Sequence, residues 1–118
     1  MAGRVWRFYS TDAGRSPVRE FLVDSSLPLA DRDEILAALK DVQVNGMSVT
    51  RHIHGEIHEV RADGRRQAYR LLFAAEGPSG QVLLGLSAYT KSGQRTPITQ
   101  IALAEHRLVD WRDRTGGR

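Results

Sequence analysis

Positively charged side chains are concentrated between residues 61 and 95, and they are the first residues whose type and spacing suggest chemistry. This stretch contains six lysines or arginines but only two acidic residues. The six are Arg61, Arg65, Arg66, Arg70, Lys91 and Arg95. Guanidinium groups form paired hydrogen bonds with phosphate oxygens, and an ammonium group attracts phosphate as a point charge. The cluster therefore favours a polyanion as the binding partner.

The distribution of charge along the whole chain supports the same interpretation. Residues 1–50 contain six basic and seven acidic residues, whereas residues 51–118 contain eleven basic and seven acidic residues. The formal net charge of +3 therefore originates in the second part of the chain. Such an asymmetry favours a nucleic-acid-binding surface. A basic surface that binds nothing acidic is the open alternative.

Cysteine and histidine residues limit the other kinds of chemistry. The sequence has no cysteine, which excludes disulfides, thiolate–metal sites and a cysteine nucleophile. His52 and His54 would share one face of a strand, and imidazole is a good metal ligand. Because no third ligand is evident, we expect neither a metal nor another cofactor. His54 is instead a candidate general base, since the pKa of histidine lies near neutral pH.

Three predicted strands, at residues 56–61, 67–75 and 81–89, carry most of the cationic cluster. Asp63-Gly64 marks a hairpin turn between the first two, and residues 76–80 mark the turn before the third. Short connections favour antiparallel neighbours. The second and third segments contain continuous apolar runs, which predict central strands covered on both faces.

The preceding residues are expected to support this sheet. Residues 4–9 alternate and are rich in aromatic side chains, which predicts a strand. Helix-start signals at Ser16-Pro17 and residues 26–28 predict two helices, and Asn45-Gly46 ends the second. The apolar stripe predicted for this second helix consists of Leu29, Ile35, Leu36, Leu39 and Val42. Its acidic first turns, with Asp31, Asp33 and Glu34, suit the helix dipole and are interpreted as a solvated face.

The C-terminal part is predicted to add one more helix. Residues 47–55 look like an irregular link, and Thr96-Pro97 repeats the signal for a helix start. Ile101, Ala104, Leu108 and Trp111 then recur on one helical face. Residues 112–118 look like a flexible tail. The prediction is one α+β domain over residues 1–118, in the order β-α-α-β-β-β-α, with a small antiparallel sheet packed against an αα-hairpin and a C-terminal helix.

Three segments in register resemble a known family. They are His58-Glu59-Val60-Arg61, Tyr69-Arg70-Leu71-Leu72-Phe73 and the stretch from Tyr89 to Pro97. These are similar to the aromatic-Glu-Leu-Arg strand, the Tyr-Arg-Val-Leu-Tyr strand and the Phe-x-Lys-Lys-x-x-Lys-Thr-Pro loop of the HigB-like, phage-derived branch of the RelE/ParE toxin superfamily. His58 replaces the usual bulky aromatic residue, and Ser92 replaces the second lysine of the usual pair.

This resemblance implies the toxin of a type II toxin–antitoxin system. Such toxins are generally ribosome-dependent endoribonucleases that cleave mRNA and so inhibit translation. The implied partners are a HigA-like antitoxin with a helix-turn-helix domain, mRNA on the ribosome, and operator DNA only through the antitoxin. The reaction uses the 2′-hydroxyl of the RNA as nucleophile, so it requires no cofactor.

The candidate site residues divide into two groups under this interpretation. Arg61 and Arg70, on neighbouring strands, would bind the phosphate and stabilise the transition state, and Lys91 would transfer a proton. The RNA-binding candidates are Arg65, Arg66, Tyr89 and Arg95. Each has a structural alternative: ion pairs with Glu56 or Glu59 for the two catalytic arginines, core packing for Tyr89, and solvated surface charge for the others.

Two other functions remain open for the whole chain. ParE relatives inhibit DNA gyrase, so the fold does not settle the target. The missing second lysine at Ser92 also leaves room for a catalytically inactive scaffold that binds its partner. The apolar runs are far shorter than a membrane span, and no apolar signal-peptide segment follows the N-terminal arginines, so we expect a cytoplasmic protein.

Overall fold

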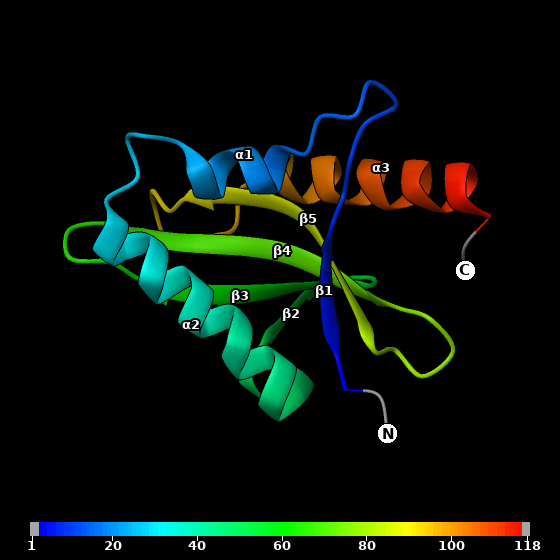
Figure 1. Cartoon of the computed structure of the whole chain (residues 1–118), viewed down its shortest axis with the longest axis horizontal. Coiled ribbons are helices and arrows are strands. Elements are labelled where there is room, and N and C mark those ends of the chain that lie inside the picture. The colour runs from blue at the N-terminus through cyan, green and yellow to red at the C-terminus, as the bar shows by residue number, and fades with distance from the viewer. Residues whose placement is uncertain (1–2, 117–118) are drawn as a thin grey trace.

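A five-stranded mixed sheet forms the centre of the molecule in a computed structural model, which describes residues 3–116 (Figure 1). The strand order is β1-β5-β4-β3-β2, and β1 pairs with β5 in parallel while all other pairs are antiparallel. The strands are β1 (Val5–Phe8), β2 (Arg51–His54), β3 (Ile57–Asp63), β4 (Ala68–Glu76) and β5 (Val82–Thr90). The prediction of an antiparallel sheet was therefore wrong at β1, whose partner lies far away in the sequence.

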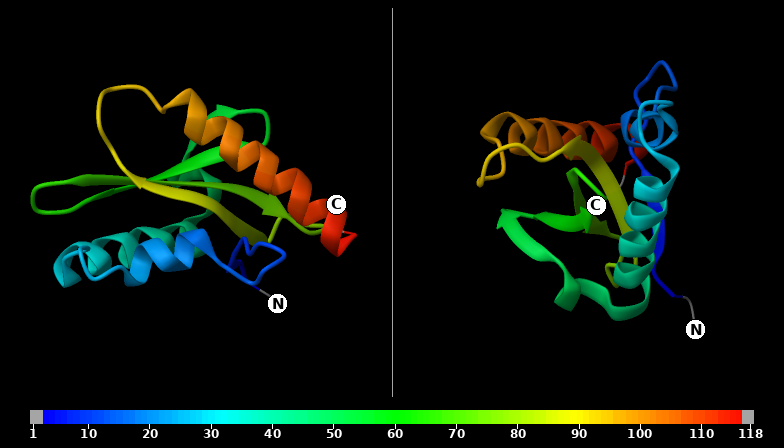
Figure 2. Two further views of the ribbon diagram at one scale, coloured as in Figure 1. Left: turned by 90° about the horizontal axis from the view of Figure 1, so that it is seen from above. Right: turned by 90° about the vertical axis from the view of Figure 1, so that its left-hand side faces the viewer.

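Helices cover both faces of this sheet. They are α1 (Pro17–Val23), α2 (Leu29–Asn45) and α3 (Ile98–Thr115), and the short 3-10 helix η1 (Gly46–Val49) follows α2. The first two helices lie on one face and α3 lies on the other (Figure 2). No helix within residues 3–116 is long and apolar enough to cross a membrane.

The predicted strands and helices are confirmed, with one addition. The three strands of the cationic region agree with the structure to within two residues. The irregular link predicted at residues 47–55 was wrong, because it contains η1 and β2. This edge strand is mostly exposed, so its sequence shows no alternation of apolar residues. The α+β class is confirmed, with the element order β-α-α-β-β-β-β-α when η1 is left aside.

Each face of the sheet has its own apolar core, which explains the continuous apolar runs of β4 and β5. Leu71 and Phe73 pack towards α1 and α2, whereas Leu72 packs towards α3. On β5, Leu83 packs towards α1 and α2, and Leu84 packs towards α3. Because successive strand residues point to opposite faces, both faces need apolar side chains.

The buried face of α2 differs from the predicted stripe. Ile35, Leu39 and Val42 are buried, but Leu29 is 71% exposed and Leu36 is 46% exposed. Asp31, predicted to face solvent, is only 3% exposed. Its carboxylate accepts hydrogen bonds from the Tyr69 hydroxyl at 2.6 Å and from the Arg65 backbone N–H at 3.1 Å. Asp31 on α2 is therefore a buried hydrogen-bond acceptor for the β3–β4 turn and for Tyr69.

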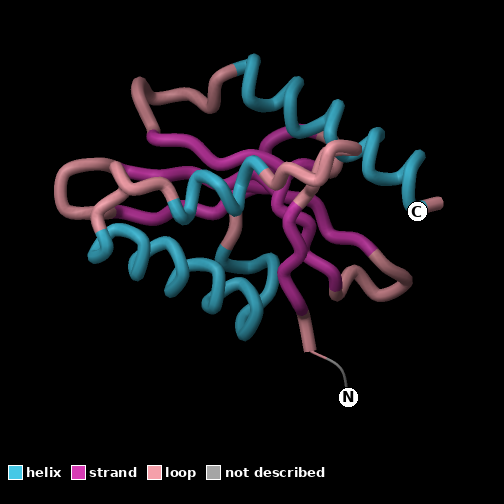
Figure 3. The backbone as a smooth tube through the Cα atoms, turned by 45° about the horizontal axis from the view of Figure 1, so that its top comes forward, coloured by secondary structure: helices cyan, strands magenta, loops and turns pink. Residues whose placement is uncertain are grey.

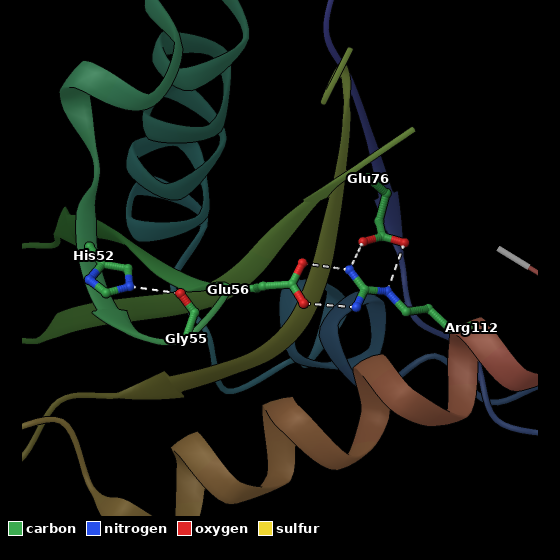
Figure 4. Close-up of polar contacts among 5 residues, drawn as sticks. All are labelled: His52, Gly55, Glu56, Glu76 and Arg112. Atoms are coloured by element: carbon green, nitrogen blue, oxygen red, sulfur yellow. Dashed lines mark hydrogen bonds and ion pairs between the residues drawn. The ribbon is translucent and has the colours of Figure 1, made fainter. Parts of the chain in front are cut away.

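The last turn of α3 corrects the prediction of a flexible tail. Residues 112–115 are helical, while residues 117–118 of the predicted tail lie outside the described part of the chain. The Arg112 guanidinium donates hydrogen bonds to both carboxylate oxygens of Glu56 and of Glu76 (Figure 4). Arg112 therefore connects α3 to the start of β3 and to the end of β4.

Candidate functional site

A shallow pocket lies between the strand ends and the loop of residues 91–97, and we call it the cation pocket. It is lined by Arg51, Glu59, Arg61, Arg70, Tyr89, Lys91, Gln94, Arg95 and Thr96. Five of these residues are basic and one is acidic. Figure 3 shows the loop that connects β5 to α3, which contributes Lys91, Gln94, Arg95 and Thr96 to the lining.

The sheet register places the strand residues of the cation pocket side by side. Arg61 is directly opposite Arg70 in the β3–β4 pair, and Arg70 is directly opposite Tyr89 in the β4–β5 pair. Arg51 is opposite Glu59 in the β2–β3 pair. Directly opposite residues point to the same face. The structure thus brings Arg61, Arg70 and Tyr89 together, whereas the sequence had placed only Arg61 and Arg70 on neighbouring strands.

A buried ion pair lies at the base of the cation pocket. The side chains of Arg70 and Glu59 are 6% and 3% exposed, and Nε of Arg70 is 3.9 Å from Oε1 of Glu59. Arg70 also donates from Nη1 to the Tyr69 carbonyl at 2.8 Å. The ion pair with Glu59, considered from the sequence as an alternative role, is therefore present. It orients the guanidinium without occupying all of its donors.

The other cations of the pocket are more accessible. Arg51, Arg61 and Arg95 are exposed, and no side chain within residues 3–116 forms an ion pair with them or with Lys91. The Lys91 ammonium group donates to the Gly93 carbonyl at 2.6 Å, and its backbone N–H donates to the Ala68 carbonyl at 2.7 Å. The pocket therefore presents uncompensated positive charge around a single internal ion pair.

Thr96 and Tyr89 connect the loop to the base of the pocket. The Thr96 hydroxyl donates to Oε2 of Glu59 at 3.0 Å, so it does not cap α3, whose N-cap residue is Pro97. Partial burial raises the pKa of the Tyr89 hydroxyl, and the nearby Glu59 carboxylate adds to this increase. Tyr89 therefore keeps its proton at neutral pH and can donate a hydrogen bond to a bound anion.

Three predicted site residues lie outside the cation pocket. Arg65 and Arg66 follow the β3–β4 turn and line a separate groove. His54 is the last residue of β2 and lies opposite Ile57, at the end of β3 that is far from the cation pocket. Its Nδ1 lies 2.8 Å from Oε2 of Glu105 on α3. The His52 ring instead interacts with the Gly55 carbonyl (Figure 4). Among the residues that the structure describes, no group of three or more potential ligands is placed to hold a metal ion.

Comparison with known protein families adds an independent observation. The family model described as phage derived protein Gp49-like (DUF891) matches residues 24–109. The chain belongs to this family. The match includes every residue that lines the cation pocket of the Gp49-like chain. The Gp49-like family is a RelE-toxin-like family, which is consistent with a role in a toxin–antitoxin system. A search of curated proteins found no match.

The structure also adds pocket residues that sequence reasoning missed in this Gp49-like chain. They are Arg51, Glu59 as a site residue, Gln94 and Thr96. Two-residue periodicity on β3 puts Glu59 on the face of Arg61, and this signal was available from the sequence. The signal for Arg51 was weaker, because β2 has no apolar alternation, although residues 55–56 form a tight turn between β2 and β3.

Proposed function

We propose that this chain is the toxin of a type II toxin–antitoxin system and that it cleaves mRNA on the ribosome without a metal cofactor. The cation pocket is the observation that carries the proposal. Four of its cations have no ion-pair partner within residues 3–116 and surround the buried Glu59–Arg70 pair, so the pocket offers positive charge to a backbone phosphate. Membership of a toxin-like family supports the same function.

In the proposed reaction, the RNA 2′-oxygen attacks the adjacent phosphorus atom and the bond from phosphorus to the 5′-oxygen breaks. Arg61 and Arg70 stabilise the charge that develops on the phosphate, with Arg51 and Arg95 at the rim. Lys91 gives a proton to the leaving 5′-oxygen. Glu59 replaces His54 as our candidate acceptor of the 2′-hydroxyl proton, because Glu59 lines the pocket and His54 interacts with Glu105.

The proposed partners follow from the same function. A helix-turn-helix antitoxin of the HigA type would bind the toxin and repress their common operon, so operator DNA would be contacted only through the antitoxin. Co-expression of a small helix-turn-helix protein encoded beside this chain should restore growth in cells that express the chain. Continued growth arrest with a stably expressed neighbour would argue against that neighbour as the antitoxin.

Primer extension on bacterial message, after expression of the chain, tests the proposed activity directly. Wild-type protein should produce new 5′ ends inside translated regions, and Lys91→Ala should reduce them by about 10²–10⁴-fold. Lys40→Ala removes an equivalent exposed charge on α2 and should cut like the wild type. Growth arrest without new 5′ ends would instead indicate a gyrase inhibitor, and neither arrest nor cleavage would indicate an inactive scaffold.

A further inference from the structure

A second concave surface lies at the same end of the sheet as the cation pocket, on the opposite face. This groove of about 660 Å³ separates the α1–α2 corner from the β3–β4 turn, and we call it the corner groove. It is lined by Phe21, Asp24, Ser26, Leu27, Pro28, Asp31, Arg65, Arg66, Gln67, Tyr69 and Thr90. The groove is far larger than the cation pocket and is large enough to hold a nucleotide.

The available charge of the corner groove is positive. Arg65 and Arg66 are exposed, and their side chains form no ion pair within residues 3–116. The two acidic residues of the groove already have donors. Asp24 accepts hydrogen bonds from the Ser26 backbone N–H at 2.8 Å and from its hydroxyl at 2.6 Å. Asp31 is buried and accepts from Tyr69, as described above. An anionic ligand therefore suits the rim of the groove.

The rest of the lining suits a flat, partly apolar group. Phe21 is half-buried, and its ring meets the Tyr69 ring edge-on with centroids 6.1 Å apart. Leu27 and Pro28 continue this apolar wall. The exposed Gln67 side chain adds hydrogen-bonding groups beside the two arginines. An aromatic side chain for stacking, cations for phosphate and an amide for base edges are the usual elements of single-stranded RNA recognition.

The corner groove lies on the α1/α2 face of the sheet and the cation pocket on the α3 face, and the end of β5 separates them. Thr90 lines the groove, whereas its neighbours Tyr89 and Lys91 line the pocket. The α1–α2 corner, the β3–β4 turn and the β5–α3 loop all lie at the same end of the sheet (Figures 2 and 3). A single strand that passes around this end of the sheet can therefore contact both sites. The Phe21 ring in the groove lining, which can stack on a base, favours RNA over an acidic peptide.

We propose that the corner groove binds a nucleotide that flanks the cleaved phosphate, with Arg65 and Arg66 on the RNA backbone and Phe21 against the base. This inference rests on the proposed function, because the cation pocket must hold the phosphate that is cut. It assigns the groove a role in base preference. The cation pocket performs the chemistry, and the groove determines which nucleotides are presented to it.

Binding of two labelled RNAs to the purified full chain tests this assignment by fluorescence anisotropy. Both probes carry 2′-O-methyl groups and cannot be cut: one of about three nucleotides and one of about nine. The wild type should bind the longer probe more tightly. The Arg65→Ala/Arg66→Ala double variant should weaken binding of the longer probe by at least 10-fold and of the shorter probe by less than 2-fold. Its salt slope for the longer probe should fall by about 1.4, since each contact to a single strand contributes about 0.7.

Matched variants separate a groove contact from general loss of charge. Arg19→Ala/Lys40→Ala removes two exposed cations outside both sites and should leave the difference between the probes unchanged. Phe21→Leu keeps an apolar side chain but removes the ring, so it should weaken binding of the longer probe and leave binding of the shorter probe unchanged. Equal losses for both probes in the arginine double variant, or equal losses in the two double variants, would overturn the proposal. Preferential binding of poly-glutamate at the groove would assign it to an acidic protein partner instead.

Sequencing of the 5′ ends in cells distinguishes failure of this inference from failure of the proposed function. The arginine double variant should still cut message, but the base frequencies beside the cuts should change. Unchanged frequencies with normal cutting would overturn the role of the groove and leave the nuclease intact. Absence of cuts by the wild type would overturn the proposed nuclease activity. The difference in affinity between the two probes would still show whether the groove binds RNA.

Discussion

The ion pairs of Arg112 with Glu56 and Glu76 allow a quantitative prediction for the stability of this fold. The Arg112 guanidinium donates to Glu56 at 2.8 and 2.7 Å and to Glu76 at 3.3 and 2.5 Å (Figure 4). Arg112→Ala removes all four hydrogen bonds. The two acceptors have very different surroundings, because the Glu56 side chain is 60% exposed and the Glu76 side chain is 6% exposed.

The burial of Glu76 determines the size of the effect. An exposed ion pair such as Arg112–Glu56 contributes only about 0.2–1 kcal/mol. A buried carboxylate that loses its cation costs about 3–5 kcal/mol. Because the Arg112 side chain is itself 26% exposed, we expect the lower value, about 3 kcal/mol. For a chain of 118 residues, this corresponds to a decrease in Tm of about 12 °C.

Urea denaturation of matched variants measures this difference. Glu56→Gln should change the free energy of unfolding by less than about 1 kcal/mol, and Arg112→Ala by about 3 kcal/mol. The Arg112→Ala/Glu76→Gln double variant should recover part of the loss, since no buried charge is then left unpaired. An Arg112→Ala variant as stable as Glu56→Gln would refute the reasoning, and it would show that Glu76 does not depend on Arg112.

Three further predictions concern the turn and the base of the cation pocket. Burial and the Asp31 carboxylate raise the pKa of Tyr69 to about 12. The protonated Tyr69 hydroxyl therefore stabilises the fold fully below about pH 10, and this stabilisation is lost as the pH rises towards 12. Denaturation across this range should show a larger loss in the wild type than in Tyr69→Phe, in which Tyr9 and Tyr89, whose pKa values are also raised, remain. A Cβ at Gly64 would lie 2.3 Å from Asp31, so thermal melts of Gly64→Ala should show destabilisation of about 1–3 kcal/mol. Glu59→Gln should keep the fold, by circular dichroism, but reduce RNA cleavage at least 10²-fold, and normal cleavage would exclude Glu59 as the base.

Local signals along the sequence were enough for most elements of the fold. Apolar runs and turn residues located β3, β4 and β5, because these signals depend on neighbouring residues only. The sequence did not reveal that β1 pairs with β5 in parallel, or that β2 forms an edge strand. The β1–β5 pairing joins segments far apart in the sequence, so no local pattern predicts it. The β2–β3 pair is a local hairpin, and β2 was missed because its exposed residues show no apolar alternation.

The same division applies to the candidate site. Apolar runs and the hairpin turn were sufficient to place Arg61 and Arg70 on neighbouring strands, and the structure shows that they are directly opposite each other. Only the folded chain brings Thr96 to Glu59, and only the fold separates Arg65 from the cation pocket. The residue types thus determine which charges are available to bind an anion. Their burial and mutual distances depend on contacts between distant segments, which the tertiary structure alone establishes.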